Sequence, residues 1–329
     1  MSLPPSEIPL GAIRFNSDSQ KLEYWMGSAW MQIQTFSPNL NGGGRALSMG
    51  GQAPGDINIV EFVTISTQGN ATNFGDLSVT RTQSAGFGSR VRGFCVGGLD
   101  SPSSYQNVID SHEFSSTSDF IDFGDLTATA RLLAAFSSST RGVAAGGQPR
   151  NDVIDYFTMA TTGSSLDFGN LPASDLFGSG LASPTRGLIK DGSTDDNSIS
   201  FVTIATTGDA QDFGDLSDTR GTHVQSAANS TRGIFAGGQT PTAVTTIDFV
   251  TIATLGNGTV FGDLTRSTVE TNAGASDPTR AIFMGNGPGA SDTIDYVAIA
   301  TQGNAVDFGN LSANRTHNCG CSNAHGGLG

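Results

Sequence analysis

Short segments of alternating apolar and polar residues follow one another through most of the chain. Residues 247–254 (IDFVTIAT) alternate with period two, and residues 231–238 (TRGIFAGG) are an apolar run that ends in two glycines. Alternation over such short lengths is typical of β-strands. Gly256 and Asn257 separate two of these segments and favour a tight hairpin, because both residue types accept positive φ. The pattern predicts an all-β protein.

The same order of segments returns six times. One marker is F-G-[DN]-L, and a second is an arginine followed by an apolar run and usually a glycine pair. The first marker begins at Phe74, Phe123, Phe168, Phe213, Phe261 and Phe308. The second begins at Arg45, Arg92, Arg141, Arg186, Arg232 and Arg280. The spacing of 45 to 49 residues is typical of four-stranded propeller blades.

The order of the segments also predicts how the repeats are joined. The acidic strand begins 13 residues before each marker phenylalanine, which indicates a hairpin of fixed length. A segment rich in small residues follows each F-G-[DN]-L, and we interpret it as the innermost strand of the next blade. The last of these segments starts at Arg315 and has no repeat after it, so we expect it to complete the first blade. The prediction is a six-bladed β-propeller over residues 38–329, closed by the C-terminal strand.

Residues 1–37 differ from the repeats and contain both tryptophans. The pattern predicts a strand around Ile13 and Phe15, a second at residues 22–25 and a third at residues 30–33. Three strands this short are hardly stable alone in water. We therefore expect an attachment module that packs on a partner, on the propeller or on copies of itself. Its attachment residues are predicted to be Phe15, Tyr24, Trp25 and Trp30.

Composition narrows the classes of partner. The formal net charge is −14, with 25 Asp but only 5 Glu and 14 Arg but only 2 Lys, a balance that favours turns and strands over helices. Nucleic acid and anionic membranes are disfavoured as partners, because they bind clustered basic residues. The chain reads as soluble, since neither a secretory signal nor an apolar stretch of roughly 20 residues is found. Three cysteines are too few for a disulfide framework and suggest assembly in a reducing compartment.

The repeated charged residues have a structural and a functional interpretation. Six marker arginines could form a ring that holds anionic sugars, but an arginine that faces a repeated acid favours a ladder of ion pairs. Five further arginines begin or nearly begin the small-residue segments: Arg81, Arg131, Arg220, Arg266 and Arg315. We expect the structural interpretation to hold for the marker arginines and the marker phenylalanines.

Ligand binding is predicted in the loops between the second and third strands, whose lengths vary between repeats. The candidate residues are Tyr105, Arg150, Asp195 and Asp196. Asp191 with Asp195 and Asp196 could bind Ca²⁺, and His317, Cys319, Cys321 and His325 could bind zinc, but neither group has the spacing of a known site. We expect no metal, no cofactor and no catalytic residues, because motifs for nucleophilic, metal-assisted or phosphate chemistry are missing.

The repeats resemble the kelch repeat over roughly residues 40–329 in their glycine pairs, period and hydrophobic order, with phenylalanine at the place of the kelch tryptophan. The repeats contain the motifs T-R-G-x-x-x-G-G, I-D-[FY]-V-T-I-A-T-x-G-N and D-F-G-[DN]-L. These motifs are similar to those of virion proteins from phages of marine bacteria, including cyanobacteria. Residues 11–30 resemble short modules of phage tail-fibre proteins. The resemblance implies a virion structural protein, associated with the tail or its fibres, that contacts other virion proteins. It further implies exposure on the particle and contact with a glycan or protein of the host surface. A capsid decoration protein and, less in keeping with the sequence, a polysaccharide-degrading propeller enzyme are the alternatives.

Overall fold

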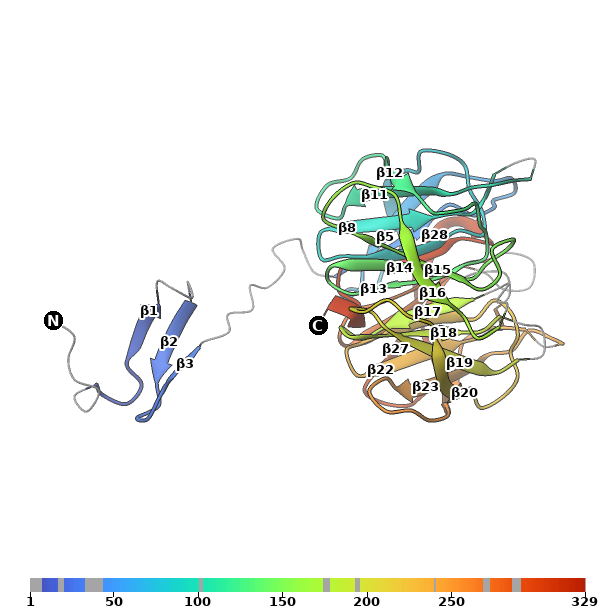
Figure 1. Cartoon of the computed structure of the whole chain (residues 1–329). Helices are drawn as coiled ribbons and strands as arrows, with labels where there is room; N and C mark the ends of the chain where they lie inside the picture. Colours follow the sequence, from blue (N-terminus) through green and yellow to red (C-terminus); the bar gives the residue numbers. More distant parts are fainter. Residues whose placement is uncertain are drawn as a thin grey trace. The chain divides into compact units, whose positions relative to one another are not determined.

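The computed structural model describes residues 8–16, 21–32, 44–100, 103–173, 178–192, 196–239, 241–268, 273–285 and 291–328. The chain divides into two compact units, Met1–Leu40 and Asn41–Gly329 (Figure 1). The boundary expected between residues 37 and 38 lies outside the described residues. The fold is all-β, and no helix in the described part of the chain is long and apolar enough to cross a membrane.

The first unit contains a three-stranded antiparallel sheet of β1 (Ile13–Asn16), β2 (Lys21–Trp25) and β3 (Trp30–Gln32). These strands agree with those expected from the sequence to within a residue or two. Pairing places Ile13 opposite Tyr24, and Tyr24 opposite Met31. Phe15 lies opposite Leu22 on the same face, because side chains on a strand alternate between the two faces.

The second unit contains six four-stranded antiparallel sheets among the described residues. We number them sheet 1 to sheet 6 and give their strands from the innermost outward. Sheet 1 has β29 (Cys319–Ser322), β4 (Arg45–Met49), β5 (Ile59–Thr64) and β6 (Thr72–Asp76). Sheet 2 has β7 (Ala85–Gly88), β8 (Arg92–Val96), β11 (Val108–Glu113) and β12 (Ile121–Asp125). Sheet 3 has β13 (Ala134–Ser137), β14 (Arg141–Ala145), β15 (Val153–Thr158) and β16 (Leu166–Asn170).

The remaining sheets follow the same order. Sheet 4 has β17 (Ser179–Ala182), β18 (Arg186–Lys190), β19 (Ser198–Thr203) and β20 (Gln211–Asp215). Sheet 5 has β21 (Gln225–Ala228), β22 (Arg232–Ala236), β23 (Thr246–Thr251) and β24 (Thr259–Asp263). Sheet 6 has β25 (Gly274–Ser276), β26 (Arg280–Met284), β27 (Ser291–Ala298) and β28 (Val306–Arg315). A two-stranded ribbon of β9 (Leu99–Asp100) and β10 (Ser104–Tyr105) and a 3-10 turn, η2 (Gly326–Leu328), complete the elements.

The innermost strands bring the sheets together. They contact one another in the order β7, β13, β17, β21, β25 and β29, and β29 also contacts β7. The strand nearest the C-terminus, β29, pairs antiparallel with β4, so that Cys321 lies opposite Leu47. An arrangement of small antiparallel sheets joined through their inner strands is compatible with a β-propeller.

The apolar core lies between neighbouring sheets rather than inside any one of them. Each marker phenylalanine is buried and occupies the bulge in the outermost hairpin of its sheet, so that Gly75 pairs with Val60 and Asn73 with Glu61 around Phe74. Phe123 of sheet 2 packs on Phe157 of sheet 3, with ring centroids 5.5 Å apart. The bulge directs a large ring into each gap between sheets, which explains why a phenylalanine returns in every repeat.

The glycine after each marker phenylalanine touches the next sheet. Gly124 has φ +154°, and a Cβ there would lie 2.4 Å from the carbonyl oxygen of Gly163 in the next hairpin turn. The same contact joins Gly309 to Gly69, between sheets 6 and 1, where the Asn310 amide also donates to Oδ1 of Asn70 over 3.1 Å. The fixed spacing of 13 residues therefore places the turn where it meets the adjacent sheet, in addition to setting the hairpin register.

Candidate functional site

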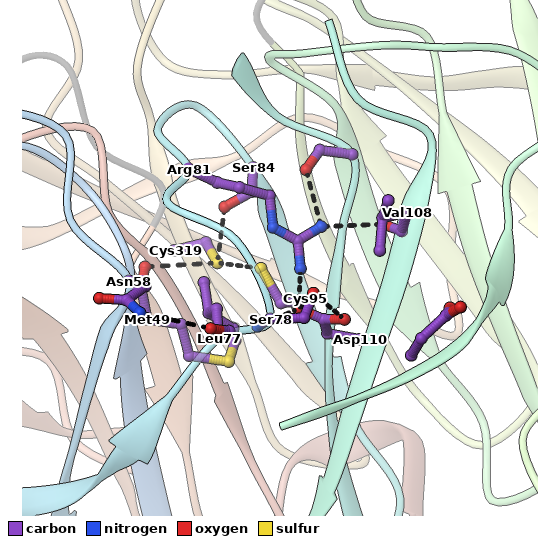
Figure 2. A network of polar contacts seen from close by, with 12 residues as sticks. Met49, Asn58, Leu77, Ser78, Arg81, Ser84, Cys95, Val108, Asp110 and Cys319 are labelled. Atoms are coloured by element: carbon purple, nitrogen blue, oxygen red, sulfur yellow. Dashed lines mark hydrogen bonds and ion pairs between the residues drawn. The ribbon is translucent and has the colours of Figure 1, made fainter. Parts of the chain in front are cut away.

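A buried ion pair links the segment before sheet 2 to the acidic strand of that sheet. Arg81 bonds to the carboxylate of Asp110, and both side chains are fully buried (Figure 2). Arg81 also donates to the carbonyl of Val108 over 2.9 Å, and Asp110 accepts from the amide and the hydroxyl of Ser78. Such a pair is tolerated in the interior because further hydrogen bonds offset much of the cost of burying the two charges, although Nε of Arg81 has no hydrogen-bond partner among the described residues. We call this position the cation position of the sheet.

The same arrangement recurs in two other sheets. Arg220 pairs with Asp248 in sheet 5, and Arg315 pairs with Glu61 in sheet 1 at 2.8 Å. As expected, these acids lie on the strand that pairs with the strand of the marker arginine. Their partners, however, are the arginines of the small-residue segments. Among the described residues, none of the six marker arginines forms an ion pair, so the expected ladder was assigned to the wrong arginines.

The marker arginines instead join neighbouring sheets by neutral contacts. Arg141 donates to the carbonyls of Ile204 and Ala205 in sheet 4 and lies over the ring of Tyr156, with 4.7 Å from its guanidinium carbon to the centroid. Corresponding ring contacts are made by Arg45, Arg186, Arg232 and Arg280. Arg92 is the exception, because the register places Ser111 where the other sheets have an aromatic ring.

Arg150 was predicted to bind a ligand in the loop between the second and third strands, and its burial contradicts this prediction. Its side chain is buried, and its guanidinium lies 2.9 Å from the carboxylate of Asp155. Ala130 stands where sheet 2 has Arg81, counted from the preceding F-G-[DN]-L, and the arginine follows one residue later as Arg131. Arg150 enters the cation position of sheet 3 from the loop between the second and third strands.

Because Arg150 occupies the cation position of sheet 3, Arg131 makes a different set of contacts. Its guanidinium donates to Oε1 of Gln148 over 2.6 Å and to Oε1 of Gln83 over 2.7 Å. It lies over the ring of Tyr105, 5.3 Å from the centroid. All four side chains are half-buried, and no carboxylate of a described residue pairs with Arg131. We call Gln83, Tyr105, Arg131 and Gln148 the Arg131 cluster.

The chemistry of the Arg131 cluster fits recognition of oxygen-rich groups. Both glutamines turn their oxygens to the arginine, which leaves the two amide nitrogens as donors directed elsewhere. A guanidinium without a carboxylate partner attracts acidic or carbonyl oxygens, and the Tyr105 ring supplies an apolar face. The sequence analysis named Tyr105 as a candidate for ligand binding but not the other three, although the one-residue shift of Arg131 was a visible signal.

The cluster borders a row of backbone positions with left-handed conformation. Gln83, Leu132, His223 and His317 have φ between 56° and 60°, and each stands two residues before an innermost strand. The amide of Leu132 donates to the carbonyl of Gln83, and that of Gln83 donates to the carbonyl of His317. Side chains other than glycine rarely adopt this conformation, and it gathers at functional sites more often than elsewhere.

Sheets 4 and 6 depart from the buried ion pair in different ways. In sheet 6 Arg266 donates to the carbonyls of Gly285 and Thr293, while Asp295 accepts from Thr265. In sheet 4 the register places Ser200 at the acidic position, and Lys190 at the end of β18 is buried.

Asp191 of sheet 4 accepts hydrogen bonds from the hydroxyls of Ser198 and Ser200. Burial raises the pKa of this carboxyl to about 6. Asp196 accepts from the amide and the hydroxyl of Ser198, whereas Asp195 lies outside the described residues. No group of three or more potential metal ligands occurs in the described part of the chain.

The innermost strands surround a cavity of about 50 Å³, lined by small residues such as Gly86, Ala135, Gly180, Ser226 and Gly320. This space suits water-sized molecules rather than an organic ligand. At the same strands, η2 contacts β13, β17 and β21, and His325 lies 2.6 Å from the carbonyl of Gly88. Burial lowers the pKa of His325 to about 4, so this histidine is neutral at pH 7.

The four residues expected to attach the first unit lie on two faces of its sheet. Phe15 and Tyr24 are exposed and share one face with Ile13, Leu22 and Met31, which the sequence prediction left out. Trp25 and Trp30 contact each other on the other face, with their rings tilted by 52° and their centroids 5.4 Å apart. That face also holds Arg14, which lies over Trp30 and pairs with Glu23 at 2.8 Å. The exposed apolar side chains of the first face are thus Ile13, Phe15, Leu22, Tyr24 and Met31, which we call the apolar face.

The chain matches none of the protein families against which it was compared, and none of the curated protein sequences.

Proposed function

We propose that the chain is a structural protein of the virion of a tailed bacteriophage, associated with the tail or its fibres. The observation that carries the proposal is the apolar face of the first unit. Ile13 and Phe15 are 65% and 63% exposed there, in a sheet too small to be stable alone. A compact unit that leaves such a face uncovered is suited to attachment. The phage assignment itself rests on the sequence resemblance.

We propose further that the second unit is a six-bladed kelch-like propeller closed by β29. The support consists of the contact of β29 with β7, its pairing with β4, and the contact of Gly309 with Gly69. Removing residues 314–329 should then abolish cooperative thermal unfolding, because sheet 1 loses its inner strand. A truncated protein with unchanged thermal stability would exclude this closure.

The proposed propeller would display the Arg131 cluster to other virion proteins or to a glycan or protein of the host surface. Catalysis is not part of the proposal, because Asp110, Asp155 and Asp248 are engaged with buried cations. The cluster instead offers donors and a ring to a ligand that is bound and not transformed.

Antibody labelling of intact particles tests the proposed location. Label on the tail would support the proposal, label on the capsid would favour a decoration protein, and absence from particles would refute a virion role. In the full chain, Phe15→Ser with Tyr24→Ser should reduce incorporation into particles. Ile121→Ser is the matched control, because Ile121 is also 65% exposed but lies in the second unit. Equal incorporation of both variants would contradict the attachment role.

A further inference from the structure

Two cysteines from opposite parts of the sequence meet between sheets 1 and 2. The sulfur of Cys95 on β8 lies 3.8 Å from the sulfur of Cys319 on β29, although the residues are 224 positions apart (Figure 2). Both are free thiols and fully buried. A disulfide needs the sulfurs about 2.05 Å apart, so the two side chains have less than 2 Å to close.

The surroundings make the two sulfurs unequal. The hydrogen bond with Cys319 lowers the pKa of the Cys95 thiol below its usual value, against the effect of burial, and the nearby Arg81 cation also lowers it. The pKa of Cys319 is raised by the same pairing and by burial, while the Ser84 hydroxyl donates to its sulfur over 3.3 Å. Cys95 is therefore the better nucleophile, since the thiolate is the reactive form.

A third cysteine provides a contrast in the same strand. Cys321 lies two residues beyond Cys319 and lines the central cavity. Burial raises the pKa of its thiol far above the usual value. Cys321 is therefore expected to stay reduced while its neighbour reacts.

We propose that Cys95 and Cys319 form an oxidation site at which a peroxide creates a disulfide between sheet 1 and sheet 2. The Cys95 thiolate attacks one oxygen of hydrogen peroxide, the O–O bond breaks, and with one proton water leaves and a sulfenic acid remains. The Cys319 sulfur then attacks the Cys95 sulfur, and its proton leaves with the hydroxyl as a second water. Two thiols and one peroxide thus give one disulfide and two waters.

The cross-link would change how the C-terminal strand is held. In the reduced protein β29 stays on β4 by hydrogen bonds and packing alone. The disulfide would tie it covalently to the neighbouring sheet and close a long loop, which restricts the unfolded chain. The thiols would permit folding in a reducing compartment, and the lock would form after exposure to oxidant. This inference does not depend on the proposed virion role.

Peptide mapping of the full chain after treatment with hydrogen peroxide tests the proposal. We expect a peptide pair joined through Cys95 and Cys319, lighter by two hydrogens, with Cys321 still available to alkylation. The thermal midpoint should rise by about 5–10 °C and return when a thiol reductant is added. Because the sulfurs are buried, urea below the unfolding midpoint should speed the reaction by opening β29 locally.

Isosteric variants separate the site from general oxidation. Cys95→Ser and Cys319→Ser should each abolish the cross-link and the rise in midpoint, whereas Cys321→Ser should keep both. The proposal is overturned if peroxide, with and without urea, yields only sulfinic acid on Cys95. A disulfide between Cys95 and Cys321, or a cross-link without any change in midpoint, would overturn it as well.

Discussion

Sheets 2 and 4 fill the same buried position with different chemistry. Sheet 2 has a full ion pair between Arg81 and Asp110, with every partner inside the protein. Sheet 4 has Ser200 in place of the acid, and its carboxyl group comes from Asp191, whose pKa is raised by burial. The same backbone therefore accepts a carboxyl group either from the third strand, as at Asp110, or from the residue after the second strand, as at Asp191. The difference teaches that the repeat keeps the shape of a position more strictly than the residue that supplies its charge.

The largest expected effect comes from breaking the pair in sheet 2. Asp110→Asn leaves Arg81 buried without its counter-charge and should lower the free energy of unfolding by about 3–5 kcal/mol. Ser200→Ala at the equivalent position of sheet 4 is the control and should cost about 1–2 kcal/mol, since it removes one hydrogen bond to the Asp191 carboxyl group but leaves no buried cation without its counter-charge. Urea denaturation of both variants measures the contrast. Equal losses in the free energy of unfolding would show that the ion pair of sheet 2 contributes no more than the hydrogen bond of sheet 4.

In sheet 3 the buried cation comes from the loop between the second and third strands rather than from the small-residue segment. Arg150→Met removes the partner of Asp155 and should cost about 3 kcal/mol or more, whereas Arg131→Met should cost less than about 1 kcal/mol. The same urea titration decides between them. If Arg131→Met proves the more harmful, Arg150 is not the residue that fills the cation position.

In sheet 4 the expected effect depends on pH. The folded-state pKa of Asp191 is about 6, above the unfolded value near 4, so the folded protein binds the extra proton between these values. Stability is therefore lost as pH rises from about 4 to about 6. Asp191→Asn removes this loss and should raise the unfolding midpoint at pH 8 but leave it unchanged at pH 4.

Asp196 serves as the matched control for this pH dependence. Partial burial raises the pKa of Asp196, but the hydrogen bonds from Ser198 outweigh this effect and hold the pKa below its usual value. Its contribution is present above the unfolded pKa and is lost as pH falls. Asp196→Asn should therefore destabilise at pH 8, the opposite sign. Thermal melts of both variants at pH 4 and pH 8 measure the two effects. A change in the unfolding midpoint of the same sign in both variants at pH 8 would contradict the assignment.

The smallest expected effect concerns the marker arginines. Arg280 donates to two carbonyls of sheet 1 and lies over Tyr296, whereas the guanidinium of Arg92 makes none of these contacts with a described residue. Arg280→Met should cost about 1 kcal/mol, and Arg92→Met less than about 0.5 kcal/mol. Thermal unfolding of the two variants compares them, and a larger loss for Arg92→Met would contradict the role given to the ring.

Much of the fold was predictable from the sequence because its signals are local. Period-two alternation and the spacing of 13 residues gave the hairpins, and the unmatched segment after Arg315 indicated its pairing with β4. Whether that pairing completes a closed propeller stays a prediction. The N-terminal strands were also predictable from local alternation. The faces on which their side chains lie were not, since the register of Ile13 with Tyr24 places both tryptophans on the side opposite to the apolar face.

The candidate site was less predictable because it depends on contacts between segments. Arg81, Arg220 and Arg315 each follow the leucine of F-G-[DN]-L by four residues, whereas Arg131 and Arg266 do not. That irregularity indicated exceptions without indicating what replaces them. The entry of Arg150 from a loop, and the meeting of Cys95 with Cys319, require the positions of neighbouring sheets in space.

The glycine after each marker phenylalanine has a mechanical consequence. At Gly124 and at Gly309 a Cβ would lie within 2.4 Å of a backbone oxygen in the adjoining turn, so a methyl group would act as a wedge between two sheets. Because these contacts run from each sheet to the next and from sheet 6 back to sheet 1, the displaced sheet has a neighbour on both sides. In the closed propeller that we propose, the strain of a single alanine would be shared around the assembly rather than released at a free edge.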